Sequence, residues 1–228
     1  MNLNYCRYYR LCKIIPRFPK LLFLFFILNS FAAKAQFSYG ESSQKFGVGI
    51  NADYDMPAGS LKYTYKAAPA YGVSFYIFDE NWTANISAGY RVYKPKQDVF
   101  YYTVGDNDYG TATYSNFRSY MLYLGGAYNF ELSDGFKIFA GINFGAYQTK
   151  FSSHSVDATQ DNTTEIQGEQ QIYGAPKAGI NLSLGENIQL SIQGSYNFFA
   201  ATGRTEYYSR TGTLYKSIST GAGLIYKF

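Results

Sequence analysis

The sequence predicts an all-β protein, an eight-stranded antiparallel up-and-down transmembrane β-barrel. Three observations lead to this prediction. Apolar and polar residues alternate with a period of two along eight segments, the connections between these segments are alternately long and short, and aromatic residues gather at both ends of the apolar face. Alternation with a period of two is typical of a strand whose two faces meet different surroundings.

The predicted strands all carry this alternation. In one of them, the apolar residues Ala84, Ile86 and Ala88 are separated by single polar or small residues. Most segments have roughly the 9–11 residues that a tilted strand needs to cross a bilayer. In chain order the segments are 46–54, 71–77, 82–92, 120–130, 138–146, 172–184, 188–198 and 214–228.

The connections between the predicted strands differ in length in a regular way. Three short connections alternate with four long ones, in the order 56–68, 79–81, 94–116, 131–135, 150–170, 185–187 and 201–212. Successive connections of an up-and-down sheet lie at opposite ends, so one end holds the tight turns and the other holds the long loops. Transmembrane barrels have this asymmetry.

The apolar face is predicted to face lipid. A soluble barrel alternates too, with its apolar face inside, but its exterior would carry more Lys and Glu than the Gly, Ser, Asn, Gln and Thr seen on the polar face here. Aromatic residues also form two girdles on the apolar face, as at the two interfaces of a membrane. The girdles are Trp82, Phe130, Phe136, Tyr226 and Phe228 at one end, and Tyr54, Tyr71, Tyr90, Tyr120, Phe144 and Phe198 at the other.

Residues 1–35 are predicted to be a signal peptide, and residues 36–228 the barrel domain. A basic leader is followed by a short apolar run, 21–33, and then by small residues that offer cleavage between Ala35 and Gln36, with Ala33 in the A-x-A position. An uncleaved anchor is the alternative, although the run is short of the ~20 residues of a membrane helix. Cleavage would remove both cysteines and leave a mature formal charge of −2. The basic whole-chain charge is therefore no argument for nucleic-acid binding.

The last strand adds a resemblance to a known family. Leu224, Tyr226 and the final Phe228 alternate on one face, which resembles the C-terminal signature of bacterial outer-membrane β-barrels. The chain is similar in plan to OmpX and to the membrane part of OmpA, and looks most like the small Bacteroidetes barrels that include PorT-like proteins. The resemblance implies export through the inner membrane, an integral location in the bacterial outer membrane, and recognition of this strand by the barrel-assembly machinery.

The interior of the barrel is predicted to hold a polar network. An eight-stranded barrel is just wide enough for its own side chains, and buried charges must be paired. The charged members of the network are Asp53, Asp55, Arg91, Lys137, Lys177 and Lys216. We expect Asp53 or Asp55 to pair with Lys216, because the first and last strands are neighbours in a closed barrel. A narrow path for water or solute is the alternative.

No catalytic, cofactor or metal site is expected. His154, the single histidine, lies among serines in the third long loop, but sequence neighbours do not fix the geometry of a triad. One histidine and no mature cysteine argue against a transition-metal site. The acidic stretches 104–110 and 157–170 are expected to be solvated loops, with weak Ca²⁺ binding as the alternative.

The expected function is that of a non-enzymatic integral outer-membrane protein whose surface loops contact the envelope or a partner. The aromatic-rich segment 98–117 suits a binding surface, an extension of the strands beyond the membrane, or both. The expected partners are outer-membrane lipid, the barrel-assembly machinery and an envelope or extracellular protein. Small-solute transport, an accessory role in secretion, as the PorT-like resemblance implies, and lipid-directed catalysis are the alternatives.

Overall fold

The computed structural model describes residues 45–104, 108–157, 161–201 and 214–228. The predicted leader, including Ala33, Ala35 and Gln36, lies outside these residues. In chain order the elements are β1 (Lys45–Ala58), α2 (Leu61–Thr64), β2 (Ala68–Asp79), β3 (Trp82–Tyr93), β4 (Phe100–Val104), β5 (Asp108–Tyr114), β6 (Phe117–Ser133), β7 (Phe136–Val156), β8 (Asp161–Ser183), β9 (Ile188–Ala201) and β10 (Leu214–Lys227).

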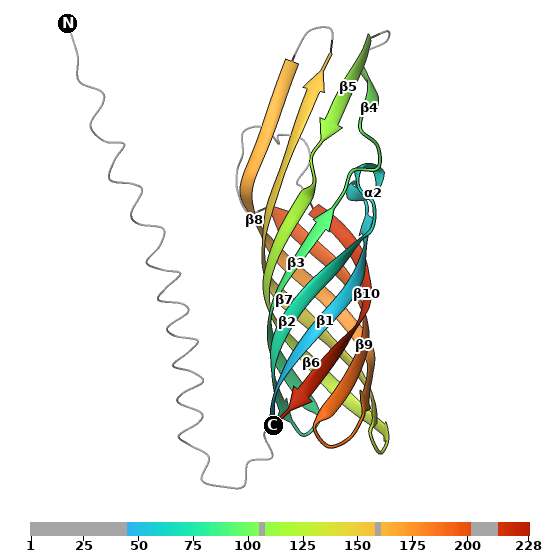
Figure 1. Cartoon of the computed structure of the whole chain (residues 1–228), viewed down its shortest axis with the longest axis vertical. Helices are drawn as coiled ribbons and strands as arrows, with labels where there is room; N and C mark the ends of the chain where they lie inside the picture. Colours follow the sequence, from blue (N-terminus) through green and yellow to red (C-terminus); the bar gives the residue numbers. More distant parts are fainter. Residues whose placement is uncertain (1–44, 105–107, 158–160, 202–213) are drawn as a thin grey trace, which may run out of the picture. The chain divides into compact units, whose positions relative to one another are not determined.

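Eight of the strands close into an antiparallel barrel in the order β1, β2, β3, β6, β7, β8, β9, β10 (Figure 1). The seam joins β1 to β10 from Gly47↔Lys227 to Ala58↔Lys216. Two backbone hydrogen bonds between Phe46 and Phe228, of 3.2 and 2.9 Å, continue it. Closure gives every barrel strand two neighbours, as a bilayer requires. The predicted eight-stranded barrel is therefore confirmed.

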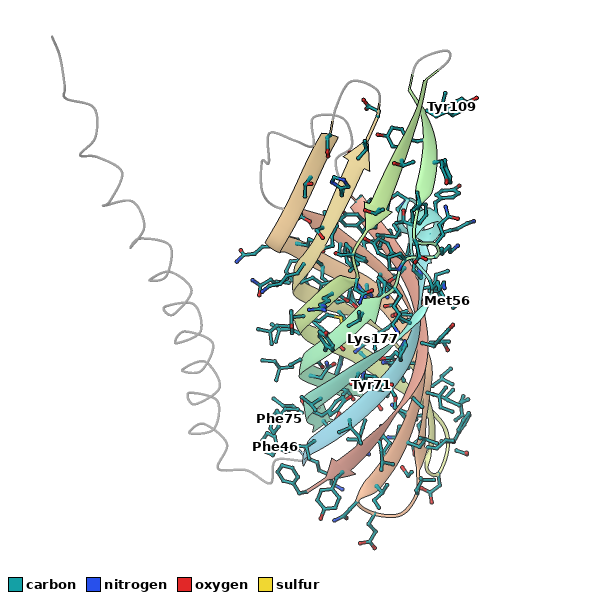
Figure 2. The ribbon with its side chains drawn as sticks, turned by 45° about the horizontal axis from the view of Figure 1, so that its top comes forward. Phe46, Met56, Tyr71, Phe75, Tyr109 and Lys177 are labelled. Carbon is teal, nitrogen blue, oxygen red and sulfur yellow. The ribbon has the colours of Figure 1, made fainter. Side chains whose placement is uncertain are left out.

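The outside of the barrel wall is apolar and exposed. Ile50, Val73 and Leu122 are 64%, 58% and 55% exposed, and Figure 2 shows Phe46, Tyr71 and Phe75 along the wall. Both predicted girdles contribute to this surface, with Trp82 and Phe228 at one end and other aromatic residues toward the opposite end. Exposed large apolar side chains over a whole wall are suited to lipid. Among the described residues, no helix is long and apolar enough to cross a membrane.

The two ends of the barrel differ as predicted. Tight turns connect β2–β3, β6–β7 and β8–β9 at what we call the turn end. Gly135 and Gly185 have φ angles of 75° and 132° in two of these turns, a conformation that glycine adopts without strain. Glu80, with a φ of 45°, has the same left-handed backbone in the third.

The opposite end carries a sheet that continues beyond the barrel. Segment 98–117 forms the strand extension that was one of its expected roles, whereas 161–170, expected to belong to a solvated loop, is part of β8. The hairpin β4–β5 lies in segment 98–117, and the ends of β7 and β8 pair from Lys150↔Gln167 to Val156↔Asp161. The β5 strand also pairs with β7 from Thr111↔Val156 to Tyr114↔Ser153. We call β4, β5 and these ends of β7 and β8 the extension sheet.

Candidate functional site: the barrel lumen and the extension sheet

Polar side chains from several strands form one hydrogen-bonded chain across the lumen near the turn end. Ser74 and Ser87 share a hydrogen bond of 2.7 Å, and Asn85 Nδ2 donates to Ser87 Oγ at 2.7 Å. Lys177 Nζ donates to Asn85 Oδ1 at 3.1 Å, which brings β8 into the chain. The inward positions of β2, β3 and β8 therefore meet in one network, because alternate residues of each strand face the lumen.

A second polar chain lies beside the first. Asn129 Nδ2 donates to Thr83 Oγ1 at 2.9 Å, and Asn181 Nδ2 donates to Asn129 Oδ1 at 3.2 Å. A cavity of about 40 Å³ lies among these side chains and is also lined by Lys177 and Asn143. The lumen near the turn end is thus polar and holds a space of a few water molecules.

The other half of the lumen contains a buried ion pair. Arg91 is completely buried and its Nη1 donates to Asp55 Oδ2. Tyr93 donates its hydroxyl to Asp55 Oδ1 at 2.7 Å, and the Arg91 guanidinium lies 4.4 Å from the ring centre of Tyr93 and 5.2 Å from that of Phe199. Each of these two charges therefore has the other as its buried partner.

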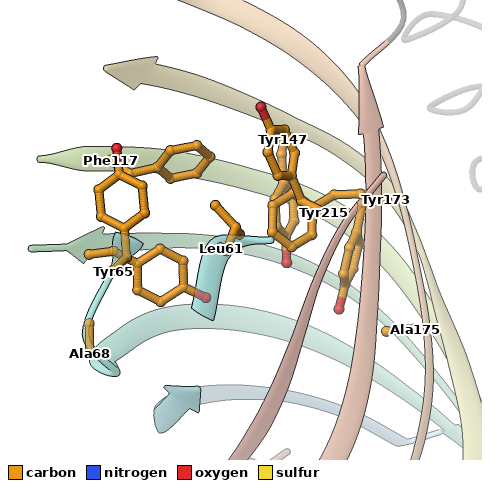
Figure 3. Packing of buried hydrophobic residues seen from close by; sticks show 10 residues of the cluster. Leu61, Tyr65, Ala68, Phe117, Tyr147, Tyr173, Ala175 and Tyr215 are labelled. Atoms are coloured by element: carbon orange, nitrogen blue, oxygen red, sulfur yellow. The ribbon is translucent and has the colours of Figure 1, made fainter. Parts of the chain in front are cut away.

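Aromatic side chains close the lumen at the same level. This cluster, which we call the plug, is almost fully buried and combines α2, the residues that flank it and inward positions of six barrel strands (Figure 3). Its members are Leu61, Tyr65, Ala68, Tyr93, Phe117, Tyr147, Tyr173, Ala175, Phe199 and Tyr215.

The first long loop is held over the plug by backbone contacts. Lys66 N donates to Lys94 O at 2.9 Å, and Lys96 N donates to Thr64 O at 2.8 Å. These bonds tie the loop after β1 to the segment after β3, so that Leu61 and Tyr65 point into the mouth of the barrel. Sequence reasoning missed the plug because its members come from distant inward positions and one loop.

The predicted interior charges take different places. Asp55 and Arg91 form the buried pair, and Lys177 joins the polar chain. Asp53 accepts hydrogen bonds from Asn51 Nδ2 at 2.7 Å and Gln193 Nε2 at 3.4 Å. Lys137 pairs with Glu131 at 2.9 Å at the rim of the turn end, where both are partly exposed.

Lys216 is not part of this network, so the expected pairing of Lys216 with Asp53 or Asp55 is wrong. It lies on β10 between Leu214 and Ile218, which are exposed on the outer wall at 47% and 44%. Because residues two apart in a strand share a face, Lys216 also lies on the outer wall. The inward neighbours on β10 are the buried residues Tyr215 and Ser217.

The remaining predicted residues lie on the outside. Leu224, Tyr226 and Phe228 are 47%, 51% and 63% exposed on the wall beside the seam. His154 lies in the extension sheet, where Nδ1 shares a hydrogen bond of 2.7 Å with Thr163 Oγ1 and Nε2 is 3.6 Å from Asp161 Oδ1. The side chains of His154 and Asp161 are 43% and 71% exposed, so water has free access to this arrangement.

The extension sheet presents aromatic side chains and unpaired strand edges. Tyr101 on β4 and Tyr109 on β5 are 77% and 76% exposed, and Figure 2 labels Tyr109. Within the part of the chain that the structure describes, β4 pairs with β5 alone, and β8 between Asp161 and Gln167 pairs with β7 alone. Both outer edges of the sheet therefore offer backbone groups to another strand.

The closed barrel, its apolar wall between two aromatic girdles and its polar, plugged lumen define an integral outer-membrane β-barrel protein. Its sequence matches no family model and no curated protein.

Solved structures with similar folds include three outer-membrane or surface proteins. Neisserial surface protein A is 16% identical, with 80% of this chain and 97% of that one covered and a TM-score of 0.49. Ail, the attachment invasion locus protein of Yersinia pestis, is 13% identical over 83% and 100%, with a TM-score of 0.40. The outer membrane protease OmpT from Escherichia coli is 12% identical over 81% and 96%, with a TM-score of 0.37.

Proposed function

We propose that this protein is a non-enzymatic outer-membrane protein whose extension sheet projects from the cell and contacts an envelope or extracellular partner. The observation that carries the proposal is the sheet itself. It continues the barrel strands beyond the membrane wall, has two outer edges and exposes Tyr101 and Tyr109. An exposed strand edge provides backbone hydrogen bonds to an added strand, and exposed Tyr side chains provide rigid contact area at low entropic cost.

The plug favours this role over solute transport. It fills the lumen at the level of Arg91 and Asp55 with almost fully buried side chains. The neighbouring lumen space measures about 40 Å³ on one side, and about 30 Å³ around Asp53 and Asn197. These spaces suit a few ordered water molecules and give no continuous route for a diffusing solute within the described barrel.

The arrangement around His154 does not favour catalysis. Its neighbours Thr163 and Asp161 lie across an exposed antiparallel strand pair, where water screens any charge that would develop in a transition state. We therefore assign this group to pairing of β7 with β8. The accessory secretion role remains a special case of partner binding, with the partner in the secretion apparatus.

The first experiment uses cysteine labelling to test which end of the barrel faces the outside of the cell. The predicted mature chain lacks cysteine, so Tyr101→Cys on β4 and Glu186→Cys in the β8–β9 turn each give a single thiol. A membrane-impermeant maleimide should label Tyr101→Cys in intact cells and Glu186→Cys only after the outer membrane is permeabilised. The reverse pattern would place the extension sheet in the periplasm.

Contact with a partner is tested by photo-crosslinking in cells. A photoreactive phenylalanine analogue at position 101 or 109 should form a discrete protein adduct, while the same analogue at lipid-facing Tyr71, which is 58% exposed, should not. A variant lacking the β4–β5 hairpin should insert normally and lose the partner on co-purification. Equal adduct formation at all three positions would contradict a specific surface.

A further inference from the structure

The lumen near the turn end carries more positive than negative charge. Four lysines occupy inward-facing positions of strands in this half, and Glu131 is the single inward acid there among the described residues. Glu131 is already paired with Lys137. The four are Lys45, Lys137, Lys177 and Lys227. Lys45 and Lys137 both act electrostatically on Lys227 near the turn end.

Lys177 has no anionic partner within the described part of the barrel. Its ammonium donates to Asn85 Oδ1 at 3.1 Å, a neutral acceptor, and it takes part in none of the ion pairs. The other lumen acids are engaged elsewhere, Asp55 by Arg91 and Asp53 by two amides. A buried ammonium without a counter-charge is unfavourable, because the surrounding dielectric is low.

Space beside Lys177 is available for a counter-ion. A cavity of about 40 Å³ is lined by Lys177, Asn85 and Asn143. Gly125 lets three polar atoms converge against the backbone here: a Cβ at this position would lie 2.3 Å from Asn85 Oδ1, 2.4 Å from Asn143 Oδ1 and 2.8 Å from Lys177 Nζ. The volume is that of one monoatomic anion or of two to three water molecules, as an order of magnitude.

Two buried amide oxygens at this cavity lack a hydrogen-bond partner, Asn143 Oδ1 and Asn181 Oδ1. Asn143 is 5% exposed, and its Oδ1 accepts no hydrogen bond. The oxygen and nitrogen of an Asn amide occupy nearly the same positions after a half-turn about the terminal bond. Turned this way, Asn143 directs an N–H group toward the place where Lys177 and Asn85 converge, and N–H groups are what an anion requires.

We propose that this cavity is a binding site for a small inorganic anion, with chloride as its abundant example. Lys177 supplies the charge, the amide of Asn143 and the hydroxyls of Ser74 and Ser87 supply polar contacts, and the anion enters from the turn end past the other three lysines. The plug prevents it from passing through. The site is independent of partner binding by the extension sheet.

The test compares thermal unfolding of the folded barrel, purified from membranes in detergent, in sodium chloride and in sodium gluconate at equal ionic strength. Wild type should unfold about 5 °C higher in 1 M chloride, and the shift should grow with the logarithm of the chloride concentration. Lys177→Met should abolish the difference. The matched control Lys216→Met, on the outer wall, should retain it. No chloride effect in wild type, or the same effect in Lys177→Met, would overturn the proposal.

Bromide soaking gives a second readout that needs no variant. Crystals of the wild-type barrel in sodium bromide should show an anomalous peak within hydrogen-bond distance of Lys177 Nζ and next to Asn143. A lumen that holds only water, or bromide bound solely at surface lysines, would reject the site even if Lys177→Met failed to fold.

Discussion

The buried pair of Asp55 and Arg91 gives the sharpest prediction about stability. Asp55→Asn removes one negative charge and almost no volume, so that the Arg91 guanidinium stays in the lumen without a counter-charge. Arg91 is completely buried and the Asp55 side chain is 3% exposed, beside the plug. Removing one partner of such a pair costs about 3–5 kcal/mol, chiefly because the other charge remains buried.

The structure also predicts how the two residues are coupled. Arg91→Met alone leaves the Asp55 carboxylate with the Tyr93 hydroxyl as its remaining partner, so it should cost a similar amount. In the double variant Asp55→Asn/Arg91→Met neither charge is present, and Met can fill apolar space between Tyr93 and Phe199. We therefore expect the double variant to lose less than the sum of the single losses by about 2 kcal/mol or more.

Urea unfolding in lipid vesicles, followed by the emission of Trp82, measures these free energies. Trp82 is the single tryptophan of the chain and is 61% exposed on the outer wall, so its emission reports on transfer out of lipid. Lys137→Met provides the control at a partly exposed pair with Glu131, where a loss of at most about 1 kcal/mol is expected. Additive losses for Asp55 and Arg91 would refute the reasoning.

Three other predictions concern the wall, the seam and the plug. Gly141→Ala should destabilise the barrel by about 1–3 kcal/mol because the new Cβ would lie 2.1 Å from Gly126 O, whereas Gly126→Ala, with nothing within 4 Å, should change urea stability by at most about 0.5 kcal/mol. Deleting residues 226–228 removes seam pairs and the proposed assembly signal, so heat-modifiable protein in the outer membrane should fall further than after deletion of 101–103 in β4; equal yields would contradict this. Leu61→Ala/Tyr65→Ala should give a measurable bilayer conductance that wild type lacks, and Tyr63→Ala, from the same loop but 74% exposed, should not.

The barrel could be predicted because the membrane imposes a strict pattern on its strands. Every crossing residue faces either lipid or a crowded lumen, so apolar Ala84, Ile86 and Ala88 alternate with inward residues and closure follows from backbone pairing. Beyond the membrane this constraint ends. Segments 98–117 and 150–170 are polar with scattered aromatics, and such residues suit a solvated β-ribbon as well as a loop. Composition therefore could not show that β4, β5, β7 and β8 extend as a sheet.

The sequence predicted which residues face the lumen better than it predicted which of them contact one another. The alternation along β1 and β3 places both Asp55 and Arg91 on the inner face of the barrel. Their contact, however, depends on how β1, β2 and β3 are aligned. Asp55 on β1 pairs with Ala68 on β2, whereas Arg91 on β3 pairs with Ala70 on β2. Lys216 is the opposite case. It lies two residues from Leu214 on β10, so alternation alone places it on the outer wall. Strict counting along β10 would have excluded Lys216. Arg91 was predicted as a member of the network, but the strand register, which sequence alone does not fix, was needed to identify it as the partner of Asp55.

The plug reflects where this fold obtains its internal packing. In a soluble domain the large apolar side chains pack against one another inside, but here most of them face lipid, where they gain little from contact with other residues of the protein. Packing between side chains is concentrated in the plug, which joins α2 and β2 to inward positions of six other strands. Stability therefore favours a filled lumen, and a filled lumen is a poor route for solutes. The extension sheet, which the membrane does not constrain, is left as the part of the molecule that can vary for recognition, and this supports partner contact as the proposed function.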